Sequence, residues 1–353
     1  MSSVLEVGFS SGDRIGNYRV ECELGPTGAG LLLLAHHLVL PRVAILKVVH
    51  SAFARVQQFV LQTLREACIL EAIAHPGVPI VYESGVLKDR RPWFALEAIT
   101  GTTLEELLAA SVTGVLSVLE VAALVRDLAG VLEHAHGRGV IHRGLRPERV
   151  VSTPDRRHPL CIPDWSEAIA HDATSHLPQS SLDSSAHYVA PELAQQAAGR
   201  GNERVDDRVD MFALGVIAYR TLTGRLPFTL VRDAAPHVAT HDLRPEAPLE
   251  LAMLVDALLS TDRFDRPRAS EVRAALDRLL TTLPAPKPRV ATRRTAPLMR
   301  IPAAAAVRGH QDVVSQDSLR LRRPRWTPDV PYRDTTDVEI AVVEDDLTES
   351  SRR

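Results

Sequence analysis

The residues best suited to chemistry are a lysine in an apolar strand and a glutamate in the helix that follows it. Lys47 lies in the segment 43–49 (VAILKVV) and is one of only three lysines in the chain, so its presence there needs a reason. Glu66 lies on the next predicted helix. A glycine-rich turn, residues 25–30 (GPTGAG), precedes the strand. Because glycine lets backbone amides approach an anion closely, such turns bind phosphate groups. This set predicts a phosphate-binding site; the alternative is an ordinary hairpin turn beside a structural ion pair.

The elements that must position these residues are first β-rich and then helical. Apolar alternation and turn residues predict strands at 17–25, 31–36, 43–49, 78–85 and 93–99, and helical spacing predicts one helix at 53–74. Further helices are predicted at 104–110, 119–136, 210–222, 249–260 and 269–282, and two short β pieces flank residues 142–150 (HRGLRPERV). A small β-rich part, 14–100, therefore precedes a larger helical part, 101–283.

The composition bounds the class of protein. The hydrophobic content of 45% is that of a core-forming globular chain, and a net charge of −3 argues against bulk nucleic-acid binding. The three cysteines have no CxxC spacing, which argues against a disulfide framework or a zinc site and favours a reducing compartment. The sequence has neither a signal-peptide pattern nor an apolar run long enough for a membrane span. We therefore expect a cytoplasmic protein.

The two ends of the chain differ from the rest. Residues 1–13 are predicted to be a short leader. Residues 284–353 are first basic and proline-rich and then acidic, and we expect them to be disordered. Basic runs bind nucleic acid or anionic lipid, and proline-rich segments dock on proteins. The alternative is a tail that remains solvated, or whose two halves attract each other.

The ordered set of motifs resembles the eukaryotic-like Ser/Thr protein kinases of bacteria, over about residues 14–283. The resemblance implies an α+β, two-lobed protein-kinase fold with a small β-rich N-lobe that contains one main helix, and a larger helical C-lobe. It also implies ATP and Mg²⁺ as cofactors. Lys47, oriented by Glu66, is placed at the α and β phosphates, and Asp164 is placed at the metal.

The resemblance assigns a set of nucleotide contacts: Gly25, Thr27, Gly30, Leu32, Ile45, Lys47, Glu66, Glu97, Ile99 and Val151. Leu96 corresponds to the gatekeeper before the hinge. Two positions depart from the family pattern. Thr27 replaces the middle glycine, and Ile45 stands where a small alanine lies over adenine, unless a one-residue bulge brings Ala44 to that place. Lys47, Asp164 and the hinge favour nucleotide binding, whereas Thr27, Ile45 and Arg149 oppose it, so ATP binding stays open at this point.

The catalytic loop, residues 142–150, departs most from the family. Gly144 replaces the aspartate that accepts the substrate hydroxyl proton, and Arg146 replaces a lysine that neutralises the transferring phosphoryl group. Arg149 replaces the asparagine that binds magnesium, and a guanidinium repels a cation. Glu148 is a poor substitute base because active family members often carry glutamate there too. The loop is therefore predicted to hold no competent catalytic residue.

The remaining matched positions imply structural roles: His142, Arg143, Trp165, Glu192, Asp210 and Arg266. Trp165 and Ser166 complete the metal motif 164–166, and they predict a locked motif, because Ser166 lacks the backbone freedom of glycine and Pro163 stiffens the approach. The activation-like segment carries Ser180, Ser181, Ser184 and Ser185, and a phosphate on one of them could meet Arg143. A solvated polar loop is the alternative.

These departures predict a pseudokinase that acts as a signalling scaffold or regulator through other signalling proteins. Its frame is kept, while the catalytic loop is changed at Gly144, Arg146 and Arg149. The alternative is an active Ser/Thr kinase with atypical or weak catalysis, favoured by the retention of Lys47, Glu66 and Asp164.

Overall fold

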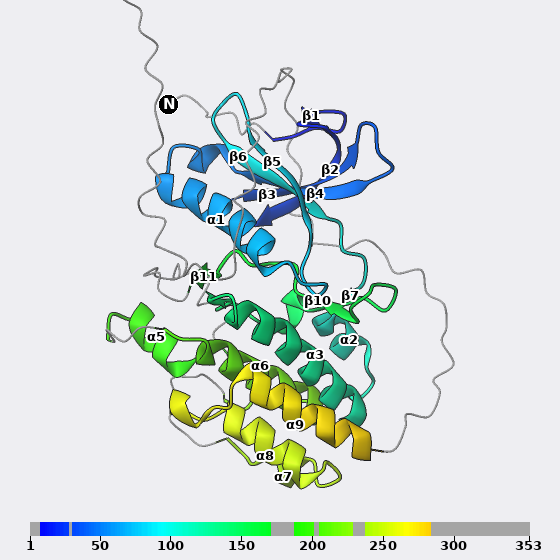
Figure 1. Ribbon diagram of the computed structural model, residues 1–353, viewed down its shortest axis with the longest axis vertical. Coiled ribbons are helices and arrows are strands. Elements are labelled where there is room, and N and C mark those ends of the chain that lie inside the picture. The colour runs from blue at the N-terminus through cyan, green and yellow to red at the C-terminus, as the bar shows by residue number, and fades with distance from the viewer. Residues whose placement is uncertain (1–7, 28–29, 171–186, 201–204, 229–236, 284–353) are drawn as a thin grey trace, which may run out of the picture. The chain divides into compact units, whose positions relative to one another are not determined.

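The computed structural model describes residues 8–27, 30–170, 187–200, 205–228 and 237–283. It has the predicted α+β, two-lobed architecture, with a curled β-sheet at the top of Figure 1 and a helical lobe below it. The predicted tail, 284–353, and the serines of the activation-like segment lie outside the described residues.

A six-stranded antiparallel sheet in the order β1-β2-β3-β4-β6-β5 forms the N-lobe. Its strands are β1 (Arg14–Ile15), β2 (Tyr18–Thr27), β3 (Gly30–His37), β4 (Val43–Val49), β5 (Val81–Val86) and β6 (Pro92–Glu97). Alternate residues of β3 and β4, such as Leu33 and Leu46, are fully buried on one face of the sheet. Lys47 pairs with Leu32 in the register and therefore lies on the opposite face, which carries the site.

One main helix, α1 (Gln57–Ile73), contacts β4, β5 and β6. The sequence predicts its start at Phe53, but residues Ser51–Phe53 form a separate 3₁₀ turn, η1. The helix ends at Ala74, which has a φ of 45° and whose N–H binds the carbonyl of Leu70. Glu66 lies well inside this helix and is buried.

The C-lobe is built from helices α2 (Leu104–Ala110), α3 (Val118–His136), α5 (Pro191–Ala197), α6 (Arg208–Thr223), α7 (Thr240–Leu243), α8 (Leu249–Leu258) and α9 (Ala269–Thr282), with the 3₁₀ turn η3 (Arg263–Asp265). Capping boxes at Thr103–Glu106 and Ser117–Glu120 fix the starts of α2 and α3. Helix α6 is buried along almost its whole length, and α3 packs against both α6 and α9. The buried helix α6 therefore provides a rigid base for the catalytic loop.

Short strands bring the two loops of the site together. β8 (Val140–Ile141) pairs with β11 (Ile169–Ala170), and β9 (Val151–Ser152) pairs with β7 (Thr102–Thr103) and β10 (Leu160–Cys161). The catalytic loop, which contains the 3₁₀ turn η2 (Pro147–Arg149), runs from β8 to β9. The loop that contains the metal motif runs from β10 to β11. These pairings tie both loops at both ends, and the ion pair between Arg149 and Asp164 joins one loop to the other.

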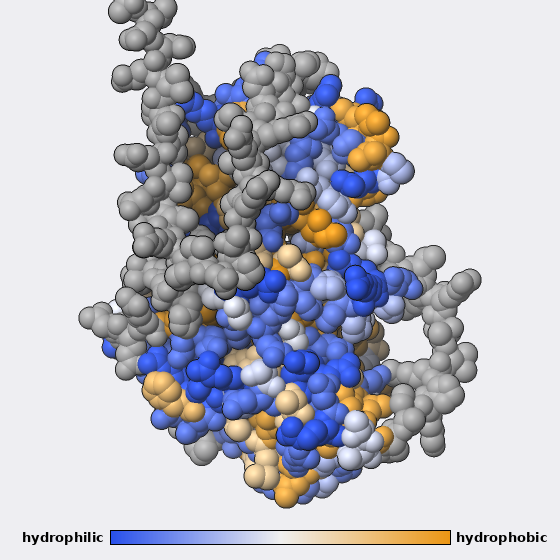
Figure 2. Space-filling model, in the orientation of Figure 1, coloured by the Kyte–Doolittle hydropathy of each residue, from blue (hydrophilic) through white to orange (hydrophobic). Residues whose placement is uncertain are grey.

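The visible surface is mainly hydrophilic in Figure 2, with hydrophobic side chains near the lower end over α7 and α8. Leu249 and Met253, one turn apart on α8, are both exposed. Exposed apolar residues of this kind are ordinary on protein surfaces. None of the described helices combines the length and the apolar character that crossing a bilayer requires.

Candidate functional site

A buried ion pair joins the sheet to helix α1. Lys47 Nζ lies 2.5 Å from Glu66 Oε2, and both side chains are almost inaccessible to solvent. Burial raises the pKa of the Glu66 carboxyl, while the charge of Lys47 opposes that effect. Gln62, one turn earlier on α1, donates to the carbonyl of Ser166 at 2.8 Å. The helix is thereby held against both the strand and the metal motif.

The carboxylate of Asp164 lies between two cations of the chain itself. Its Oδ2 is 2.9 Å from Arg149 Nε, and its Oδ1 is 4.0 Å from Lys47 Nζ. Burial alone would raise the pKa of Asp164, but Arg149 and then Lys47 hold it well below its usual range. Asp164 is therefore ionised and already neutralised.

The guanidinium of Arg149 is the centre of this arrangement. Besides Asp164, its Nη2 lies 2.7 Å from Glu167 Oε1, and its Nη1 donates to the carbonyl oxygen of Gly144 at 3.0 Å. Only 9% of the residue is exposed. Burial alone would lower the pKa of Arg149, but Asp164 and Glu167 raise it, so the charge persists at any accessible pH. Arg149 thus links the catalytic loop to the metal motif.

Gly144 leaves the space that this network occupies. A Cβ built at Gly144 would lie 2.2 Å from Arg149 Nη1 and 2.7 Å from Glu167 Oε2. Both distances are far below a normal contact, so no larger side chain fits without moving the ion pair. The glycine is therefore a steric requirement of the Arg149–Glu167 pair as well as a missing carboxylate.

Glu167 is the functional residue that the sequence did not reveal to us. It follows the metal motif directly in the sequence and is only 5% exposed. A usable signal was present, because a glutamate in the otherwise apolar or small segment that follows Ser166 needs a buried partner. Glu148, the substitute base that we considered, has a side chain that is 52% exposed and lies 3.8 Å from Arg146.

Asp210 of α6 anchors the catalytic loop as predicted from the resemblance. Its carboxylate accepts the backbone N–H groups of His142 at 2.8 Å and Arg143 at 2.7 Å. His136 Nε2 lies 2.9 Å from the same carboxylate. Arg143 has a φ of 62°, an unfavourable backbone conformation for a side chain of this size, and donates from Nε to the carbonyl of Glu167. The anchor therefore holds a strained loop in place.

The C-lobe frame also contains a bidentate pair between Arg266 and Glu192. Arg266 Nη1 and Nη2 lie 2.7 and 2.9 Å from the two oxygens of Glu192. The guanidinium also donates to the backbone carbonyls of Ser260 and Arg208. These contacts tie α5 to η3 and to the start of α6.

Trp165 is fully buried in the metal motif and makes a specific hydrogen bond. Its Nε1 donates to the carbonyl of Ile162 at 2.8 Å, and its ring meets His142 edge-on at 4.5 Å. Burial lowers the pKa of His142, which keeps that imidazole neutral. These contacts tie the indole to the segment before the motif and to the catalytic loop, and the locked motif stays a prediction.

Replacing Trp165 by phenylalanine should lower the free energy of unfolding by about 1–3 kcal/mol, because the buried carbonyl of Ile162 loses its donor. The matched control is Trp93→Phe. Trp93 is equally buried, but its indole N–H has no hydrogen bond among the described residues. Urea unfolding followed by circular dichroism measures both changes. Equal losses for the two variants would show that the hydrogen bond contributes nothing specific.

The register of β4 decides between the two alternatives that the sequence left open at Ile45. β4 pairs residue by residue with β3 and with β6, so no bulge brings Ala44 to the face of Lys47. Ala44 points into the core on the other face, and Ile45 lies on the face of Lys47. The strand before the glycine-rich turn extends further than predicted, because Gly25–Thr27 belong to β2 and Thr27 pairs with Gly30. Gly25 has a φ of 137°, which only glycine adopts readily.

The remaining predicted contacts are placed along β3, β6 and the adjoining loops. Leu32 is opposite Lys47, and Leu96 is opposite Ile45. The Glu97 side chain is 2.6 Å from Arg156. Ile99 and Val151 pack together with Cys161 in a small buried cluster.

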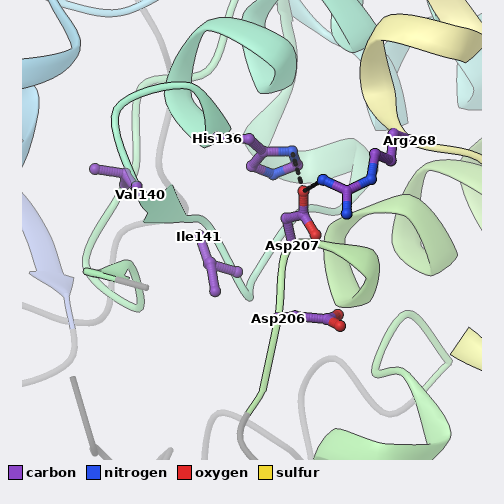
Figure 3. A pocket seen from close by; sticks show the side chains of 7 residues that line it. His136, Val140, Ile141, Asp206, Asp207 and Arg268 are labelled. Carbon is purple, nitrogen blue, oxygen red and sulfur yellow. Dashed lines mark ion pairs between the residues drawn. The ribbon is translucent and has the colours of Figure 1, made fainter. Parts of the chain in front are cut away.

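A separate cavity of about 450 Å³ lies beside the anchor, and His136, Asp207 and Arg268 are among the residues that line it. His136 and Arg268 approach Asp207 from two sides, each at 3.9 Å (Figure 3). Its lining does not include the residues predicted to contact nucleotide. The cavity is therefore distinct from the Lys47–Asp164 site.

Comparisons with known proteins decide the family. The family model of the protein kinase domain matches residues 18–289. The chain belongs to the protein kinase family. Within that family it is 32% identical over 272 residues to the serine/threonine-protein kinase pkn3 of Myxococcus xanthus, covering 72% of this chain and 48% of that protein. It is 28% identical over 281 residues to PknB of Mycobacterium tuberculosis, covering 76% and 44%.

Solved kinase structures agree with the fold. The PknI kinase domain of Mycobacterium tuberculosis superposes with a TM-score of 0.59 at 27% identity, covering 77% of this chain and 99% of that one. The autoinhibited serine kinase domain of the giant muscle protein titin superposes with a TM-score of 0.62 at 20% identity, covering 76% and 82%. The chain spans about half the length of the bacterial kinases that it matches in sequence.

Proposed function

We propose that this chain is a pseudokinase, which binds other signalling proteins and does not transfer phosphate at a useful rate. The observation that carries the proposal is the Arg149 guanidinium, 2.9 Å from the only carboxylate of the metal motif. The catalytic loop also lacks the base, because Gly144 stands at its position. Loss of a general base alone costs about 10²–10⁴-fold in rate. The intact Asp210 and Arg266 contacts support a frame that is kept for binding.

An Mg²⁺ ion does not fit the residues that the family would use for it. Mg²⁺ takes oxygen ligands in a small octahedral shell. Here Arg149 replaces one oxygen ligand by a cation, and the same guanidinium pairs with Asp164. We therefore derive no catalytic step through a metal ion at this site.

Transfer of labelled γ-phosphate from ATP, to the chain itself and to generic protein substrates, tests the proposal. We expect the wild type to give no more product than Lys47→Ala, which removes the predicted phosphate contact. Product from the wild type that disappears in Lys47→Ala would refute the pseudokinase.

An active kinase with a relocated base is the second candidate, and one observation favours it. The carboxylate of Glu167 lies 2.7 Å from the position of a Cβ at Gly144, close to where the missing aspartate would lie. However, its side chain is only 4% exposed and is paired with Arg149, so it does not reach a substrate hydroxyl in this arrangement. This candidate predicts activity in the wild type that falls in Glu167→Gln, a substitution that keeps the shape and removes the base.

A further inference from the structure

The metal motif keeps the carboxylate of Asp164, but other groups of the chain already occupy the positions around its two oxygens. Asp164 Oδ2 is 2.9 Å from Arg149 Nε, and Oδ1 is 3.1 Å from the Ser166 backbone N–H, which donates to it. Lys47 Nζ is 4.0 Å from Oδ1 on the remaining side. A divalent cation at Asp164 would have to displace the guanidinium and would meet the repulsion of two cationic side chains.

The guanidinium is held in this position by contacts that do not involve Asp164. Glu167 and the carbonyl of Gly144 bind its Nη2 and Nη1. Glu167 is buried and has no solvent shell to replace Arg149 if the arginine leaves. A side chain at Gly144 would overlap the pair, so the glycine leaves the space that Arg149 occupies. Displacement by a metal therefore requires more than the loss of one surface ion pair.

This arrangement changes the charge that a phosphate group would encounter near Asp164. In phosphoryl-transfer sites the metal lies between the motif carboxylate and the phosphates and removes their mutual repulsion. Here Arg149 removes the charge of Asp164 from within the chain, and Lys47 faces the same region. A polyphosphate can then approach without bringing a cation of its own.

We propose that the Lys47–Asp164 site binds nucleoside triphosphate in its metal-free form, with Arg149 as a built-in substitute for the metal ion, and that Mg²⁺ weakens the binding. This inference rests on the proposed function, since it gives the ligand of a site that does not catalyse. It concerns the ligand alone, and absence of phosphotransfer is a separate property.

The test measures ATP affinity of the full chain by isothermal titration calorimetry, once with excess EDTA and once with excess Mg²⁺. We expect binding in EDTA that is weakened at least about fivefold by Mg²⁺, the lower end of the usual range for coupling between two ligands. Binding that needs Mg²⁺, equal binding in both buffers, or no binding in either buffer overturns the inference. None of these results affects the pseudokinase proposal, which fails only if the wild type transfers phosphate.

Two variants assign the effect to its residues. In Arg149→Asn the preference should reverse, so that Mg²⁺ strengthens ATP binding, because Asp164 becomes available to the ion. In Asp164→Asn the binding in EDTA should persist, since Arg149 keeps Glu167 as its partner and no metal is needed. An unchanged preference in Arg149→Asn, or loss of EDTA binding in a folded Asp164→Asn, overturns the role of Arg149. Thermal unfolding of each variant identifies one that fails to fold, and the wild-type comparison and the other variant then decide the question.

Discussion

Replacing Arg149 by methionine should lower the free energy of unfolding by about 3–5 kcal/mol, the usual loss when one partner of a buried ion pair is removed. Methionine fills much of the same volume without a charge. Two carboxylates, Asp164 and Glu167, then lose a counter-charge that lies 2.9 and 2.7 Å away. Urea unfolding at neutral pH, followed by fluorescence or circular dichroism, measures the change.

Arg273→Met is the matched control for this variant. Arg273 also pairs with a carboxylate, that of Glu133, but on the surface, where its side chain is 47% exposed. Such pairs contribute about 0–1 kcal/mol. Adding Glu167→Gln to Arg149→Met should recover part of the loss, because one uncompensated carboxylate disappears. A loss in Arg149→Met no larger than that in Arg273→Met would contradict the network.

The same network predicts how the stability loss depends on pH. Because the pKa of Asp164 is held well below its usual range, its stabilising contribution is complete above the unfolded-state pKa, about 3.9, and is lost as the pH falls below that value. Without Arg149 this pKa rises, so the variant loses less on acidification. The stability difference between wild type and Arg149→Met should therefore shrink below about pH 4. A difference that stays constant from pH 7 to pH 3 would exclude Asp164 as its source.

The sequence was sufficient for the fold because local signals agreed with one another. The helices 104–110 and 269–282 have the predicted bounds, and capping residues such as Thr103 and Glu106 explain why the first of them begins where it does. Apolar alternation bounded by turn residues also located the strands of the N-lobe. The start of α1 was predicted too early, because apolar spacing does not distinguish a 3₁₀ turn from the helix that follows it.

The site could be predicted only as a set of departures from a family pattern. Gly144 and Arg149 were both identified, but as separate losses. Their relation depends on three-dimensional contact: the backbone brings Arg149 onto Asp164, and Gly144 leaves the space for the pair with Glu167. Glu167 was missed because a residue outside the family's functional positions carries no role by resemblance. The absence of a bulge in β4 depended on strand register, which spacing alone does not fix.

Replacing Gly144, Arg149 and Glu167 together should restore phosphotransfer. The variant Gly144→Asp/Arg149→Asn/Glu167→Leu returns a base and a metal ligand, and it removes a buried carboxylate that would otherwise be unpaired and overlap the new aspartate. Restoring the base alone accounts for about 10²–10⁴-fold in rate. The double variant Gly144→Asp/Arg149→Asn should gain less, because Glu167 still occupies the space beside residue 144.

The rate of γ-phosphate transfer from Mg²⁺-ATP, measured in one assay for the wild type, the triple variant and each of them with Lys47→Ala, tests the central claim most directly. We predict that the wild type equals its Lys47→Ala background, and that the triple variant exceeds it by about 10²-fold or more in a manner that Lys47→Ala abolishes. A wild type that matches the triple variant and loses its activity in Lys47→Ala would contradict the account, because Arg149 would then not disable the site.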